Sequence, residues 1–204
     1  MVKGRFIGLE VCMTKQESLE QLYNEYRTAL EGNEIVLGDG NINSEVLLIG
    51  EAPGKDEVKQ GKPFVGAAGK NLTEFLSLLG LARQEIYITN AIKYRLSETN
   101  PQTSRVVNRP ATRKEIEQNR VYLLKEIEII DPIYIVTLGN VPLKAISEES
   151  KISIGNVHGQ LIEVTVLQKE YKLFPLYHLA SIIYNRNLKS IYLNDIEKLS
   201  SIVR

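Results

Sequence analysis

The sequence predicts an α/β fold, a three-layer α/β/α sandwich with a central, mainly parallel four-stranded sheet. Three observations predict it. Short apolar runs rich in β-branched residues alternate along the chain with longer segments whose apolar residues recur at helical spacing. The apolar runs are bounded by Gly, Asn or Pro, as strands are. They are also apolar almost throughout, which is typical of parallel strands buried on both faces.

The elements follow in order along the chain. We expect strands at 46–49, 86–88 and 133–138, and a further strand pair, or one strand with a β-turn, across 161–166 and 171–176. The periodic segments predict helices over the ranges 15–30, 68–79, 112–130 and 188–203. In the third helix, Thr112 is placed to cap the first turn and Glu115 follows three residues later.

Composition limits the possible classes. The 204 residues predict a single domain over 1–204, with 1–14 as an N-terminal extension of unclear role. The 25 basic residues balance 25 acidic ones, so any nucleic-acid surface must be local. Cys12 is the only cysteine, which excludes an internal disulfide and a cluster held by several thiolates. The apolar patch before Glu10 is too short for a membrane span, so we expect a cytoplasmic protein with no membrane contact.

Polar residues follow several of the predicted strands. In open parallel sheets, ligands bind beyond the carboxyl ends of the strands. That rule brings four stretches to one edge of the sheet, namely 50–51, 89–90, 138–140 and 177–178. A carboxylate (Glu51), an amide (Asn90) and an imidazole (His178) are therefore expected to face one crevice.

The glycine-rich stretch after the first strand has three possible interpretations. It lacks the Walker spacing, because the Gly-Lys pair at 69–70 is followed by Asn71, and it lacks the dinucleotide fingerprint. Phosphate binding is therefore disfavoured, while a strain-relieving turn and the floor of an active site remain open. A turn alone does not explain Glu51 at the strand exit or Phe64 inside the loop.

Five motifs, taken together, resemble those of the family 4 uracil-DNA glycosylases, from about residue 20 to the C-terminus. They are GEAPGKDEVKQGKPFVGAAG (50–69), ITNAIKYR (88–95), NRPATRKEIEQNR (108–120), IVTLGN (135–140) and YHLASIIYNRNLK (177–189). The resemblance implies a uracil-DNA glycosylase-like fold and a monofunctional enzyme, a hydrolase that removes uracil flipped out of DNA in base excision repair.

The resemblance also implies roles for individual residues. Glu51 would orient or deprotonate the attacking water, and His178 would stabilise the charge that develops on uracil O2. Phe64 would stack on the base and Asn90 would read its O4 and N3–H, with Gly50 and Ala52 also at the base. Residues that would contact DNA are Lys62, Arg109, Ser181 and Arg186.

Several points stay open at this stage. Residues 182–184 either wedge into the duplex or belong to the core, and His158, where the family tends to have Arg, is left as a backbone contact. Alternative functions are a non-catalytic DNA-binding relative, or a glycosylase for hypoxanthine or xanthine. The expected partner is uracil-containing DNA, the expected state a monomer, and no metal or cofactor is expected.

The sequence departs from the family in three places. The family usually holds a [4Fe–4S] cluster on four cysteines, and those positions carry Tyr23, Tyr26, Tyr94 and Asn119. We expect these four side chains to fill the space as one packed cluster. The segment 96–107 is longer than the family's Pro-rich connection and predicts a mobile loop. Leu179 stands where the family has Pro after the histidine.

Overall fold

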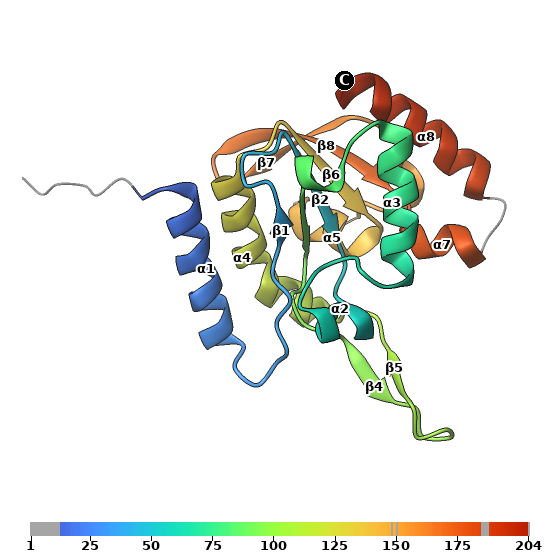
Figure 1. The fold of residues 1–204 in the computed structure, drawn as a ribbon. Coiled ribbons are helices and arrows are strands. Elements are labelled where there is room, and N and C mark those ends of the chain that lie inside the picture. Colours follow the sequence, from blue (N-terminus) through green and yellow to red (C-terminus); the bar gives the residue numbers. More distant parts are fainter. Residues whose placement is uncertain (1–12, 148, 150, 185–187, 204) are drawn as a thin grey trace, which may run out of the picture.

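A six-stranded sheet forms the centre of the protein in a computed structural model that describes residues 13–147, 149, 151–184 and 188–203 (Figure 1). The strand order is β1-β3-β2-β6-β8-β7. Its inner strands are mutually parallel: β3 (Tyr87–Asn90), β2 (Val46–Gly50), β6 (Tyr134–Leu138) and β8 (Lys169–Leu176). These are the four strands expected from the apolar runs. The edge strands β1 (Asp39–Gly40) and β7 (Ile162–Val166) are antiparallel to their neighbours. The pairing of β7 with β8 confirms the strand pair expected over 161–166 and 171–176, whereas β1 was not predicted, and the sheet has six strands where four were expected.

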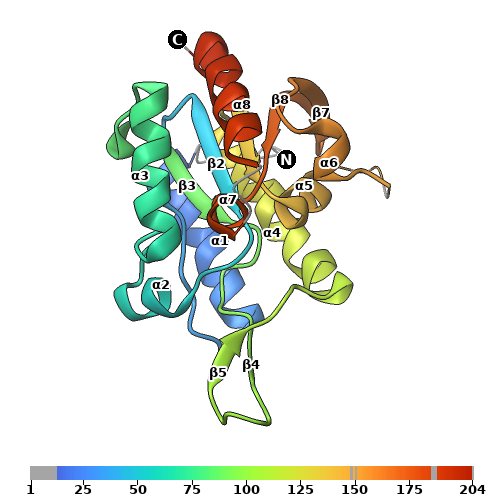
Figure 2. The ribbon, with the colours of Figure 1, turned by 90° about the vertical axis from the view of Figure 1, so that its right-hand side faces the viewer.

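Helices cover both faces of the sheet, which confirms the three-layer α/β/α arrangement (Figures 1 and 2). One face carries α1 (Lys15–Ala29), α4 (Arg113–Ile130), α5 (Asn140–Ile146) and α6 (Ile154–Val157). The other face carries α3 (Ala67–Leu79), α7 (Leu179–Tyr184) and α8 (Leu188–Val203). Alternate residues of each inner strand are buried under the two helical layers, so the strands are apolar without a break.

The long helices begin and end at residues suited to those positions. Thr14 caps α1 and Thr112 caps α4, each in a reciprocal pair with the glutamate three residues on, as expected for α4. Helix α3 ends at Gly80, which has a φ of 70°, and α4 ends at Asp131, also in the left-handed region. Pro132 then prevents α4 from continuing.

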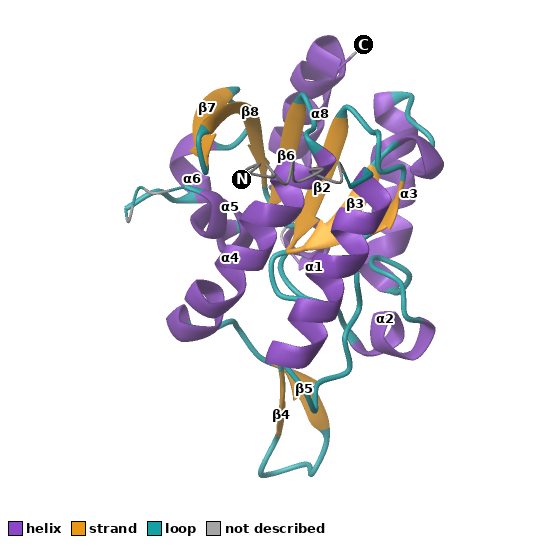
Figure 3. Cartoon of the chain, turned by 90° about the vertical axis from the view of Figure 1, so that its left-hand side faces the viewer, coloured by secondary structure: helices purple, strands orange, loops and turns teal. Residues whose placement is uncertain are grey.

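A β-hairpin of β4 (Ser97–Thr99) and β5 (Val106–Asn108) projects from the body of the protein (Figure 3). The segment 96–107, predicted to be a mobile loop, is therefore largely an ordered pair of strands and its turn. Asn100 explains the difference, because its side chain accepts the backbone N–H groups of Gln102 and Thr103 and closes the turn. The short α2 (Lys55–Gln60) and the 3-10 turn η1 (Arg83–Glu85) were also not predicted.

The residues at the family's cysteine positions form two groups. Tyr26 and Tyr94 belong to one hydrophobic cluster, and the Tyr26 hydroxyl donates to Asn119 Oδ1. Tyr23 belongs to the neighbouring core, where its hydroxyl bonds to Tyr87 and Glu126. The prediction of a single cluster was thus wrong for Tyr23, because that side chain is hydrogen-bonded to a buried acid instead of the Asn amide.

A buried lysine joins these two groups. The backbone N–H of Lys93 donates to the Tyr26 hydroxyl at 3.0 Å, and its Nζ lies 2.6 Å from Glu126 Oε2. The same Nζ also donates to Thr89 Oγ1 and to the carbonyl of Asn90. Lys93 and Glu126 are both essentially inaccessible to solvent. This network therefore ties α1 and α4 to the end of β3, beside the predicted site.

No helix in the described part of the chain is long and apolar enough to cross a membrane.

Candidate active site

A cleft of about 370 Å³ lies at the carboxyl ends of the parallel strands. This volume falls within the range typical of small-ligand sites. Five of the six residues predicted for catalysis and base binding line this cleft: Glu51, Ala52, Phe64, Asn90 and His178. They come from three strand exits and one loop. Three of the four stretches expected from the strand-end rule therefore meet here, whereas 138–140 is not among the lining residues.

Glu51 follows β2 directly and is half-buried. Its Oε1 accepts a long hydrogen bond, 3.4 Å, from the backbone N–H of Ala111. Burial raises the pKa of the Glu51 carboxyl above its ordinary value, and the bond from Ala111 opposes that shift. The carboxylate is thus held in place and is more basic than a surface glutamate.

His178 lies between β8 and α7. In the sheet, β2 and β6 separate β8 from β3, so His178 and Asn90 reach the cleft from strands that are not neighbours. Its Nδ1 accepts the backbone N–H of Ala180 at 3.1 Å. Burial lowers the pKa of the imidazole, so the ring is neutral at pH 7. Because Nδ1 is an acceptor, the neutral ring carries its proton on Nε2, which is left as a donor.

The side chains of Phe64 and Asn90 both lie close to Gly50. A Cβ added to Gly50 would lie 2.5 Å from the Phe64 ring and 2.5 Å from Asn90 Oδ1, so no larger residue fits there. Gly50 therefore lies against both lining side chains, although it does not itself line the cleft. Phe64 has a φ of 53°, and its ring is buried among the residues under α3 while also lining the cleft. It is thus both a core residue and a wall of the site.

Glu57 organises the loop that holds Phe64, a role that the sequence alone did not suggest. Its carboxylate accepts three backbone N–H groups, from Gly54 at 3.1 Å, Val65 at 3.0 Å and Gly66 at 2.7 Å. From the other side, the Arg83 guanidinium donates to the carbonyls of the residues at 63 and 64. The loop is therefore fixed by one anion and one cation before any ligand arrives.

Three of the residues predicted to contact DNA, Lys62, Arg109 and Ser181, are not among the residues that line the cleft. Lys62 is exposed and lies 3.6 Å from Asp39. The Arg109 guanidinium makes two hydrogen bonds, of 2.9 and 2.6 Å, to Glu115 at the start of α4. Ser181 is partly buried on α7, and Arg186 lies outside the described residues. The side chains of 182–184 also lie outside the described part of the chain. The DNA contacts of all these residues therefore stay predictions.

His158 is more than a backbone contact. Its Nδ1 lies 2.7 Å from Asp195 Oδ2, and its ring packs against Tyr177 with centroids 4.7 Å apart. Asp195 is buried on α8, so this pair connects α8 to the residue preceding His178. A Cβ on Gly159 would overlap Asp195, which explains the glycine there.

Other lining residues were missed by the sequence reasoning. Asn108, at the end of the hairpin, and Lys55 and Asp56, at the start of α2, line the same cleft. Asn108 stands in the Asn-Arg motif, which was noted but assigned no role in the pocket. The acidic spacer after Gly54 was the available signal for Glu57, since it falls in the first turn of a helix.

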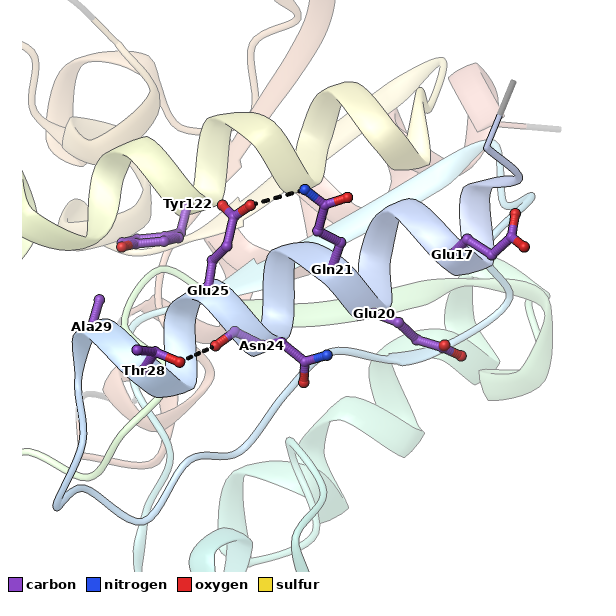
Figure 4. A pocket seen from close by; sticks show the side chains of 8 residues that line it. All are labelled: Glu17, Glu20, Gln21, Asn24, Glu25, Thr28, Ala29 and Tyr122. Atoms are coloured by element: carbon purple, nitrogen blue, oxygen red, sulfur yellow. Dashed lines mark hydrogen bonds between the residues drawn. The ribbon is translucent and has the colours of Figure 1, made fainter. Parts of the chain in front are cut away.

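A second, shallower hollow of about 940 Å³ lies on the outer side of α1 and α4 (Figure 4). Three carboxylates and several neutral polar groups line it: Glu17, Glu20, Glu25, Gln21, Asn24, Thr28, Ala29 and Tyr122. Lys125 lies 3.5 Å from Glu25 at its edge. The carboxylates would repel phosphates, and none of the predicted site residues lies there.

Comparisons with known proteins identify the family of the chain. The family model described as "Uracil DNA glycosylase superfamily" matches residues 37–197, and the chain belongs to this superfamily. Among its relatives are proteins named type-4 uracil-DNA glycosylase. That of Archaeoglobus fulgidus is 38% identical over 82% of this chain and 81% of its own. That of Sulfurisphaera tokodaii is 40% identical over 80% and 72%, and that of Thermotoga maritima 36% identical over 86% of each.

The residues at the family's cluster positions do not fit an iron–sulfur cluster. None of the four supplies a thiolate, and the Tyr26 and Tyr23 hydroxyls are already bonded to Asn119 and Glu126. Within the described residues there is also no group of three or more His, Cys, Asp or Glu side chains arranged to hold a metal ion. The space is thus filled by aromatic rings and a hydrogen-bonded amide.

Proposed function

We propose that this protein is a uracil-DNA glycosylase, a monofunctional enzyme that hydrolyses the N-glycosidic bond of uracil flipped out of DNA and so initiates base excision repair. One observation carries the proposal: Glu51, Phe64, Asn90 and His178 line one cleft at the ends of parallel strands. Membership of the superfamily and the names of the type-4 relatives support it.

Recognition of the base uses the two residues that flank Gly50. The Phe64 ring provides a flat apolar wall on which the pyrimidine stacks. The Asn90 amide pairs its donor with uracil O4 and its acceptor with N3–H, a pattern that cytosine does not match. Asn90 is held for this task, because Lys93 Nζ donates to its backbone carbonyl at 3.1 Å.

The chemical step places negative charge on uracil and positive charge on the sugar. The two proposed catalytic residues, which follow different strands, each stabilise one of these charges. As the bond from C1′ to N1 breaks, the electron pair leaves with uracil, and the neutral His178 ring donates from Nε2 to uracil O2. The sugar becomes cationic, and the Glu51 carboxylate both stabilises it and accepts the proton of the attacking water. The products are uracil and an abasic site.

Excision from a labelled oligonucleotide that carries one uracil tests the proposal. We expect alkali-dependent strand scission with the wild-type protein. Replacing Glu51 or His178 with Ala should lower the rate by about 10²-fold or more each, in the range usual for general bases and oxyanion donors. Glu163→Ala, which removes an exposed carboxylate from β7, is the matched control and should leave the rate unchanged.

The same assay separates the alternative functions. Oligonucleotides with hypoxanthine or xanthine in place of uracil should remain intact. Scission of one of these instead would make the protein a glycosylase of another deaminated base. No scission of any of them, with DNA binding still measurable, would leave a non-catalytic DNA-binding relative. A cytoplasmic location, a monomeric state and one domain over 1–204 stay predictions.

A further inference from the structure

The β4–β5 hairpin is an ordered element that extends outward from the cleft. At its base, Leu96 is buried, the Arg109 N–H donates to the Leu96 carbonyl at 3.1 Å, and Arg95 Nε donates to Asn108 Oδ1 at 2.9 Å. At its tip, the Asn100 N–H donates to the Arg105 carbonyl at 2.8 Å. Both ends of the hairpin are thus fixed by hydrogen bonds, and the ribbon projects away from the sheet (Figures 1 and 3).

The strand register shows which face of the hairpin is turned to the cleft. Ser97 pairs with Asn108 and Thr99 pairs with Val106, while Glu98 pairs with Val107 between them. Paired residues lie on the same face, and successive residues alternate between faces. Asn108 lines the cleft, so Val106 and Thr99 continue the cleft-side face outward.

The outer end of the hairpin combines apolar and basic character. Val106 is 55% exposed and belongs to none of the hydrophobic core clusters of the described residues. Arg105 precedes it, and this side chain forms no ion pair within the described part of the chain. The hairpin segment 97–108 has one acidic residue, Glu98. The outer hairpin thus offers one free cation beside one apolar side chain.

These features fit duplex DNA better than a single strand. Non-specific recognition of single strands relies on aromatic side chains on which bases stack, and no residue from 97 to 108 is aromatic. A two-stranded ribbon fits a groove of B-DNA, where cations meet phosphates and small apolar side chains meet base edges.

We propose that the β4–β5 hairpin is a second DNA-contacting element, which lies against the duplex beside the extruded nucleotide and places Arg105 on a phosphate and Val106 in the groove. The inference rests on the proposed function, since the cleft is taken to hold the flipped uracil. On this proposal, the protein contacts the DNA duplex beyond the nucleotide that is excised.

The variant Arg105→Ala/Val106→Ala tests this role, because both side chains are exposed and their removal leaves the core intact. The matched control is Val121→Ala/Lys125→Ala, which removes an exposed valine and a cation from the outer side of α4. Two substrates are compared: a uracil-containing duplex of about 30 base pairs, and a trinucleotide with a central uracil. A trinucleotide has no flanking duplex, so its rate reports on the cleft without the duplex contacts proposed for the hairpin.

We expect kcat/KM on the duplex to fall about fivefold or more in the hairpin variant, with the trinucleotide rate and both control rates unchanged. The slope of log affinity against log salt for a uracil-free duplex should also decrease in magnitude by about one in Arg105→Ala. Equal losses on both substrates, or no loss on the duplex, would overturn the proposal. So would equal weakening of binding to a single strand of the same length.

The binding measurement also separates this inference from the proposed function. If the wild-type protein excised no uracil from either substrate, the proposed function would fail. The hairpin role would then be decided by duplex affinity alone, measured by fluorescence anisotropy of the labelled duplex. A hairpin variant that binds as the wild type does would overturn it, and a specific loss relative to the α4 control would support it.

Discussion

At the scale of single residues, the two proposed catalytic groups have pKa values shifted toward each other. Burial raises the pKa of Glu51 and lowers the pKa of His178, and each shift has a clear chemical use. A glutamate of raised pKa is a better proton acceptor, and an imidazole of lowered pKa stays neutral and donates without a fixed positive charge. Ionised Glu51 and neutral His178 coexist at pH 7.

The pH dependence of excision follows from these directions. The rate requires ionised Glu51 and neutral His178, so it should be constant near pH 7 and fall as the pH decreases. Since burial raises the Glu51 pKa, the fall should occur at a higher pH than it would for a surface carboxylate. Single-turnover rates from pH 4 to 9 measure it.

Glu51→Gln provides the control for that profile. It should lower the rate and shift the remaining acid limb toward the value set by His178 alone. A midpoint at or above pH 7 would contradict the assigned protonation states. So would a limb that keeps the same midpoint and slope in Glu51→Gln.

At the scale of elements, the loop from α2 to α3 is shaped by backbone contacts more than by side-chain packing. Phe64 has a positive φ, which costs energy for a non-glycine residue, and Glu57 and Arg83 hold it there. Gly69, in the first turn of α3, is required because a Cβ would lie 2.2 Å from the Phe64 carbonyl oxygen. The position of the Phe64 wall of the cleft thus depends on a residue that does not line the cleft.

Gly69→Ala should therefore displace Phe64. We expect KM for uracil-containing DNA to rise about tenfold and stability to fall by about 1–3 kcal/mol, the usual cost of forcing a side chain against backbone. Urea denaturation and steady-state kinetics measure the two effects. Gly155→Ala is the matched control, because its Cβ would meet only Ser153 Oγ at 3.9 Å. Equal behaviour of the two variants would refute the role of Gly69.

The same scale shows what the sequence can predict. The inner strands and the long helices α1, α3, α4 and α8 were predictable, because continuous apolar runs and helical spacing extend over enough residues. The short helices were not predictable, because they are too short to show helical spacing, and β1 and the hairpin strand β4 were not, because they contain no apolar run. Strand ends predicted where Glu51, Asn90 and His178 meet. Glu57 and Asn108 act through local backbone geometry, which strand patterns do not contain.

At the scale of the whole molecule, the buried pair of Lys93 and Glu126 connects distant parts of the chain. Glu126 on α4 meets Tyr23 of α1 and Tyr87 of β3, while Lys93 reaches Tyr26 of α1 and the Asn90 carbonyl at the site. Charges so far from solvent are tolerated only when paired and hydrogen-bonded. The network thus makes the attachment of α1 and the position of Asn90 depend on each other.

Lys93→Met should destabilise the fold by about 3–5 kcal/mol, since it leaves the Glu126 carboxylate buried without a counter-charge. Lys93→Met/Glu126→Leu should be less destabilised than the sum of the single variants, because neither charge remains. Urea denaturation of the four proteins measures this coupling. Strict additivity would show that the pair does not act as a unit.

The purified protein should contain no stoichiometric iron, because no thiolates are present at the four family positions. Elemental analysis measures the iron content directly. Uracil excision should also be unchanged after prolonged treatment with a chelator. Stoichiometric iron, or loss of the folded state on chelation, would contradict the assignment of Tyr23, Tyr26, Tyr94 and Asn119 as a substitute for the cluster.

The hydrogen bond from Tyr26 to Asn119 has a consequence for how the protein is made. A core closed by tyrosine and asparagine forms from the polypeptide alone, so folding does not wait for a cluster-assembly machinery, a sulfur donor or an iron supply. Active protein should therefore appear as soon as translation ends, in aerobic cell-free synthesis as well as in iron-starved cells. Its abundance would follow the rate of translation, and dioxygen would have no cofactor to destroy.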